Sequence, residues 1–94
     1  DEPMIHIAAV ELKDAAKNSA MIVEAVKRFG KWAAPVTGVF LIEADITADK
    51  LRDFFRPYLL DGDKVFVIAA GKDWSSYRLS PAVAKWLKVK GRKM

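Results

Sequence analysis

Four short apolar runs, separated by two stretches of helical periodicity, constrain the fold of this chain more than any other sequence feature. The runs cover residues 4–10, 31–36, 39–42 and 65–70, and they have the length and residue types of strands. Asn18 and Thr47 are residue types that cap helices, and apolar side chains follow each at intervals of three or four residues. Ser80-Pro81 then predicts a short C-terminal helix, because a cap is followed by a first-turn proline.

The predicted order is strand, helix, strand, strand, helix, strand, followed by the short helix. This order is typical of an α+β, ferredoxin-like fold with one four-stranded antiparallel sheet. Pro35 cannot donate a ladder hydrogen bond, so we expect the strand at 31–36 to lie at a sheet edge. We expect one domain over residues 4–88 and a basic tail over 89–94. Residues 1–3 are expected to be a remnant of expression, with Met4 as the natural first residue.

Composition excludes several classes of function. The chain has no cysteine, which removes disulfides, thiol catalysis and thiolate metal sites. The chain has one histidine, His6, which excludes a multi-histidine metal centre. The sequence offers no clear serine and aspartate partners with which His6 would form a hydrolase triad. No glycine-rich phosphate loop is present. Every apolar run is far shorter than the roughly 20 residues that span a bilayer, so we expect a soluble, cytoplasmic protein with no membrane partner.

The first, third and fourth predicted strands are apolar at consecutive positions, which predicts burial on both faces of the sheet. In the last strand Val65 and Val67 point to one face, while Phe66 and Ile68 point to the other. Two helices cover only one face, so we expect a second copy of the chain to cover the other, as a homodimer. His6 is expected to be packed or to lie in that interface, where its protonation would loosen the dimer.

Charge is distributed unevenly along the chain. The net charge of +4 divides into −2 over residues 1–73 and +6 over residues 74–94, and the latter segment contains no acid. A concentrated basic end favours binding to nucleic-acid phosphates, although a solvated tail that aids solubility explains it equally well. Trp74 and Tyr77 either stack on bases or, as we expect, pack under the last helix or against the partner subunit. The candidate nucleic-acid-binding residues are Lys72, Trp74, Arg78, Lys85, Lys88, Lys90, Arg92 and Lys93. Arg52 and Arg56 are instead expected to pair with Asp49 and Asp53 at helical spacing.

Several segments together resemble a known group of proteins. They are Glu11 after the first strand, Gly30-Lys-Trp32, Thr47-Ala-Asp-Lys-Leu-Arg-Asp53, Leu60-Asp-Gly-Asp-Lys-Val-Phe-Val-Ile68, and Gly71-Lys-Asp-Trp74 before a Trp-Leu helix. In this order they resemble the small SinR-like proteins and, more distantly, the ferredoxin-like CRISPR adaptation subunit that partners the integrase. The virulence-associated protein D ribonucleases are similar by fold.

The resemblance implies a homodimer that meets DNA or RNA. Glu11 occupies the position where nuclease members carry an aspartate that pairs across the two-fold axis to hold a divalent metal. Glutamate is longer, and Mg²⁺ demands near-ideal distances, so the substitution favours binding without cleavage. One alternative is a Mg²⁺- or Mn²⁺-dependent endonuclease in which paired Glu11 residues are metal ligands and catalytic groups. Another is an interaction module that docks a larger protein partner.

Overall fold

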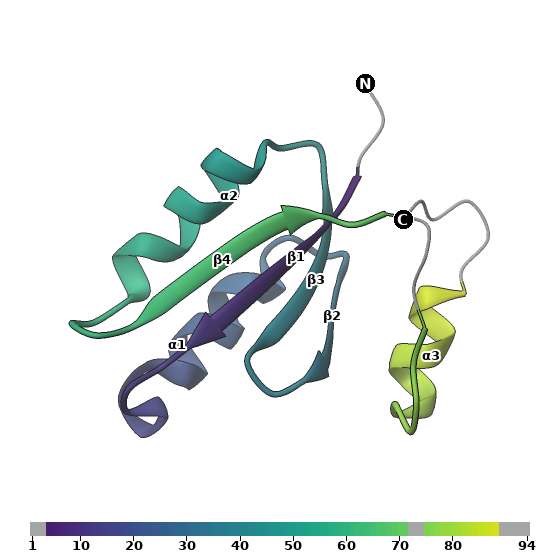
Figure 1. Ribbon diagram of the computed structural model, residues 1–94, viewed down its shortest axis with the longest axis horizontal. Coiled ribbons are helices and arrows are strands. Elements are labelled where there is room, and N and C mark those ends of the chain that lie inside the picture. The colour runs from purple at the N-terminus through teal and green to yellow at the C-terminus, as the bar shows by residue number, and fades with distance from the viewer. Residues whose placement is uncertain (1–3, 72–74, 89–94) are drawn as a thin grey trace.

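The computed structural model describes residues 4–71 and 75–88 as a single sheet with helices packed on it (Figure 1). The elements in chain order are β1 (Met4–Glu11), α1 (Ala15–Lys27), β2 (Trp32–Val36), β3 (Val39–Ala44), α2 (Ala48–Phe55), the 3-10 turn η1 (Arg56–Tyr58), β4 (Lys64–Ala69) and α3 (Pro81–Leu87). The strands lie in the order β2-β3-β1-β4, and every neighbouring pair is antiparallel. The α+β fold expected from the sequence is confirmed, and its topology is consistent with a ferredoxin-like arrangement.

Local signals explain where most elements begin and end. Thr47 caps α2, since its Oγ1 accepts a hydrogen bond from the Lys50 amide at 3.2 Å. Ser80 caps α3 in the same way, accepting from the amide of Val83 at 3.3 Å. The regular helix α2 gives way to a 3-10 turn at Pro57, which is the distortion that a proline there predicts. Strand β2, which contains Pro35, lies at the sheet edge, as expected.

Helices α1 and α2 cover one face of the sheet and form the main core. Ile22 and Val26 of α1 pack with Leu51 and Phe55 of α2 against the buried strand residues Ala8, Phe40 and Ile42. Each of the large side chains is almost completely removed from water. Burial of such a side chain stabilises the fold by about 1.5–3 kcal/mol relative to exposure, so this layer supplies most of the hydrophobic stabilisation.

The other face of the sheet is only half covered. Leu87 of α3 packs against Ile5, Ala33 and Leu41, which covers the half of this face nearer β2. On the β4 half, Phe66 is 63% exposed and Ile68 is 48% exposed. We call this region, formed by the outward side chains of β4 and the neighbouring part of β1, the open face. Helix α3 therefore supplies part of the cover that we expected from a second copy.

The sequence interpretation of Asn18 as a helix cap is wrong. Helix α1 begins at Ala15, with Asp14 at the capping position, and Asn18 lies inside the helix. The buried Asn18 Nδ2 donates to the carbonyl of Tyr58 and to Asp63 Oδ2, each at 2.9 Å. A long-range polar link that ties α1 to the loop before β4 has therefore replaced the local capping role.

Asp63 is the centre of that loop. Its carboxylate accepts hydrogen bonds from the backbone amide of Lys13 at 2.9 Å and from the amide of Leu60 at 2.7 Å, besides the amide group of Asn18. The hydrogen bond from Lys13, followed by those from Leu60 and Asn18, lowers the pKa of Asp63 below its ordinary value. One charged side chain thus joins the end of β1, α1 and the turn that precedes β4.

Candidate nucleic-acid interface

Most cations in the body of the domain are matched by a carboxylate. Arg52 lies 3.1 Å from Asp53 and 3.7 Å from Asp49, and Arg56 lies 3.8 Å from Asp53, which confirms the pairing expected from helical spacing. The other ion pairs join Lys17 to Asp14, Lys27 to Glu24, Lys31 to Glu43 and Lys64 to Glu11. Because their charge is locally neutralised, these side chains are weaker candidates for contact with phosphates.

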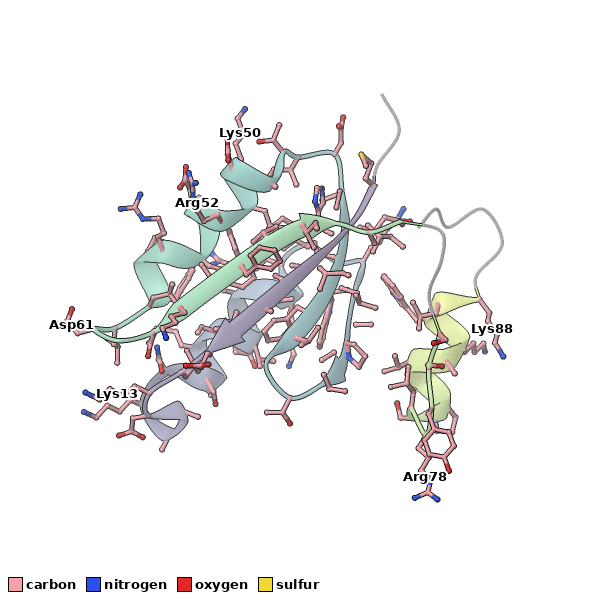
Figure 2. All side chains as sticks on the ribbon, viewed as in Figure 1. Lys13, Lys50, Arg52, Asp61, Arg78 and Lys88 are labelled. Atoms are coloured by element: carbon pink, nitrogen blue, oxygen red, sulfur yellow. The ribbon has the colours of Figure 1, made fainter. Side chains whose placement is uncertain are left out.

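The segment from 75 to 88 differs from the body in this respect. It contains three cations, Arg78, Lys85 and Lys88, and no acidic residue. All three are exposed, and none forms an ion pair with any residue that the structure describes. Figure 2 shows Arg78 and Lys88 at opposite ends of α3, with both side chains directed away from the sheet. We call these three side chains the basic cluster.

An exposed aromatic ring lies next to the basic cluster. Tyr77 is 79% exposed, and the guanidinium carbon of Arg78 lies 4.9 Å from the centre of its ring. The Arg78 backbone adopts a φ of 61°, in the left-handed region that few residues other than glycine occupy. For Tyr77 the interpretation as a side chain packed under the last helix is therefore wrong. A flat ring beside a cation is an arrangement that stacks bases and contacts phosphates.

Five of the predicted nucleic-acid-binding residues, Lys72, Trp74, Lys90, Arg92 and Lys93, lie outside the described residues. Of the predicted residues, the structure describes Arg78, Lys85 and Lys88, which are spread along the segment that contains α3, with Tyr77 beside Arg78. The exposure of Tyr77 could not be derived from the sequence, because an aromatic residue beside a helix start is equally compatible with packing.

Glu11 is the last residue of β1, and its side chain lies on the open face. It is exposed, and its Oε2 lies 3.8 Å from Nζ of Lys64, its antiparallel neighbour on β4. Asp14, the other acid near this strand end, is directed to Lys17 at 4.0 Å. Within residues 4–71 and 75–88, no three His, Asp or Glu side chains gather closely enough to hold a metal ion. Among the described residues of the single chain, the charged neighbour of Glu11 is thus the cation of Lys64.

His6 lies on the helix-covered face, beside Ala8 in the alternation of β1 and opposite Ile42 of β3. It is 2% exposed, and neither ring nitrogen has a hydrogen-bond partner in the described structure. The hypothesis that His6 lies in an interface on the open face is wrong, because the side chain points to the opposite face. The expectation that it is packed is confirmed.

No protein-family model, curated protein or solved structure matches the chain. Among the residues described, no helix has both the length and the apolar character needed to cross a membrane.

Proposed function

We propose that the protein is a homodimer that binds the phosphate backbone of nucleic acids without cleaving it. The observation that supports this proposal is the contrast in pairing between the body of the domain and the basic cluster. Cations that are already matched by carboxylates gain little from a phosphate, whereas Arg78, Lys85 and Lys88 retain their full charge. Neutralising phosphates with such side chains releases condensed counterions, and this release drives binding.

The open face supports the dimeric part of the proposal. Phe66 and Ile68 expose large apolar side chains next to each other on β4, and Ile7 of β1 is only half-buried beside them. A second copy presents the same apolar surface, so the exposed side chains of the two copies can cover each other. The resemblance to the SinR-like proteins and to the CRISPR adaptation subunit favours the same assembly.

A salt titration of binding tests the proposal. Labelled duplex DNA and single-stranded RNA are titrated with the protein at several salt concentrations, and the logarithm of the affinity is plotted against that of the salt concentration. On duplex DNA the slope is negative, and the loss of each phosphate contact makes it shallower by about 0.9. We therefore expect Lys85→Gln/Lys88→Gln to reduce the slope by up to about 1.8 for each bound protomer.

The control variant is Lys17→Gln/Lys27→Gln, which removes the same charge from lysines that already pair with Asp14 and Glu24. We expect its slope to equal that of the unmodified protein. Equal losses in the two variants would show that only net charge matters, and absence of binding at low salt would contradict the proposal altogether.

Glu11 supports a second candidate, a Mg²⁺- or Mn²⁺-dependent endonuclease. Since Glu11 lies on the same face as Phe66, a second copy docked there brings its own Glu11 to that face. Two carboxylates held together bind a divalent ion that activates water for attack on a phosphodiester. The test is cleavage of DNA and RNA with each metal. Cleavage that Glu11→Ala abolishes and Glu43→Ala leaves intact would establish this candidate in place of binding alone.

A further inference from the structure

Tyr77 is turned away from the domain although the segment around it is held against the sheet. Its side chain is 79% exposed, whereas Leu79, two residues further along, is half-buried and packs against the cluster that contains Leu87. In an extended chain, two residues separated by one other point to the same side. The left-handed backbone of Arg78, with a φ of 61°, lies between Tyr77 and Leu79 and breaks this alternation. The local backbone therefore directs the ring outward.

This arrangement combines two unfavourable features at one position. Residues other than glycine seldom adopt the left-handed conformation, and such conformations cluster at binding sites, where they hold a side chain in a required orientation. The conformation of Arg78 also leaves the large ring of Tyr77 in contact with water, where it gains nothing from burial. The two features together indicate a ligand that covers the ring.

The surroundings of the ring favour nucleic acid over a protein surface. Two exposed serines precede Tyr77, the exposed Arg78 follows it, and residues 75–88 contain no acid. The exposed apolar residues Phe66 and Ile68 lie on β4, on the half of the sheet that α3 does not cover. Protein-binding hot spots are surrounded by other packed residues that exclude water. A single ring among polar groups and cations instead matches a base that is joined to phosphates.

The ring and the basic cluster offer separate contacts to one strand. The guanidinium of Arg78 lies over one face of the Tyr77 ring, with its carbon 4.9 Å from the ring centre, and the high exposure of Tyr77 leaves the opposite face open. Lys85 and Lys88 are exposed one helical turn apart, and Figure 2 shows Arg78 and Lys88 at opposite ends of α3. A strand with one base on Tyr77 can therefore extend its phosphates along α3 toward Lys88.

We propose that Tyr77 and Arg78 form a stacking site for an unpaired base, which directs the basic cluster to single-stranded nucleic acid. This inference rests on the nucleic-acid binding proposed above, and it adds the class of ligand. A base inside a duplex is already paired and stacked on its neighbours, so the ring could reach it only at the cost of unstacking. A single strand offers free base faces, whereas phosphates are present in both forms.

The test compares three ligands of equal length, bound to the full chain at one salt concentration. They are a labelled single strand, the corresponding duplex, and a single strand whose nucleotides lack bases. We expect Tyr77→Ala to raise the Kd of the ordinary strand about 5- to 150-fold, the range that corresponds to the loss of one stacked base. Tyr77→Phe retains the ring and should bind like the unmodified protein.

The duplex and the base-free strand provide the internal reference. Their Kd values should be the same for Tyr77→Ala and for the unmodified protein, because neither ligand offers an accessible base to the ring. Equal losses of affinity for the ordinary strand and the base-free strand would overturn the proposal, since the ring would then act on something other than a base.

Leu60→Ala is the matched control variant. Leu60 is 49% exposed and lies next to Asp61, which Figure 2 places across the molecule from α3. It therefore removes an exposed side chain without changing the basic cluster, and it should leave every Kd unchanged. Sedimentation velocity of Tyr77→Ala without nucleic acid tests the competing occupant. A raised dimer Kd in that variant would assign the ring to the contact between two copies and overturn the stacking site.

Failure of the stacking site differs in its signature from failure of the proposed function. The ring carries no charge, so Tyr77→Ala should leave the salt slope unchanged, whereas Lys85→Gln/Lys88→Gln should make the slope shallower and preserve the preference for single strands. Salt-dependent binding that Tyr77→Ala does not weaken would overturn the stacking site alone. Absence of binding to all three ligands would overturn both proposals.

Discussion

Replacement of Phe66 with serine is the most direct perturbation of the proposed dimer. Burial of a phenylalanine side chain is worth up to about 3 kcal/mol, and 63% of Phe66 is still exposed in the single chain. About 2 kcal/mol of further burial is therefore available for each protomer, and about 4 kcal/mol for a two-fold dimer in which both copies contribute. At 1.4 kcal/mol for each factor of ten, Phe66→Ser should raise the dimer Kd by about 1,000-fold.

Sedimentation velocity over a range of protein concentrations measures this Kd, and circular dichroism verifies that the variant is folded. Met21→Ser is the matched control, since Met21 is 49% exposed but lies on α1, on the opposite side of the sheet. A dimer constant that changes equally in both variants would refute the assignment of the interface to the open face. A chain that is monomeric at micromolar concentration would refute the dimer itself, and it would favour a larger protein partner for the exposed apolar residues.

Three further predictions concern stability. Hydrogen bonds lower the pKa of Asp63 in the folded state. The ionised carboxylate therefore stabilises the fold at pH values above its ordinary pKa of 3.8, and this stabilisation is lost as the pH falls through the lower pKa of the folded state. In urea unfolding, the Asp63→Asn variant should lack this acid-induced loss of stability. Gly38→Ala should destabilise the fold by more than about 1 kcal/mol, because φ is +83° and the added Cβ would lie 2.7 Å from the Val10 carbonyl oxygen, whereas Gly30→Ala, with nothing within 4 Å, should cost less. Phe55→Ala should cost about 3–5 kcal/mol in thermal or urea unfolding, since the side chain is fully buried between the helices and the sheet.

Signals that act within a few residues allowed the order of elements to be predicted. The caps Thr47 and Ser80 work through an amide three residues away, and Pro35 excludes a central strand by its own missing donor. The prediction that Asn18 caps a helix was wrong because its contacts are distant in the sequence. Its hydrogen-bond partners, Tyr58 and Asp63, are 40 and 45 residues distant, and no local pattern reveals them.

The sequence could not predict that His6 lies on the helix-covered face, because periodicity does not contain this information. Alternation along β1 separates His6 from Ile5 and Ile7, but it does not determine which of the two sets the helices cover. The same ambiguity hides the role of α3, since an amphipathic C-terminal helix fits either face. By contrast, the acid-free stretch that holds Lys85 and Lys88 was visible in the sequence, because charge is a property of each residue and needs no partner.

The open face and the basic cluster are connected through α3. This helix covers the β2 half of the same face whose β4 half exposes Phe66, so a second copy docked on the open half brings its own α3 and basic cluster to the same assembly. The proposed dimer therefore presents twice as many unpaired cations to one duplex, and the salt slope of binding should fall by about half in Phe66→Ser even though Lys85 and Lys88 are intact. A slope that stays unchanged in the monomeric variant would show that each basic cluster binds phosphates alone. In that case the open face would have a function separate from nucleic acid.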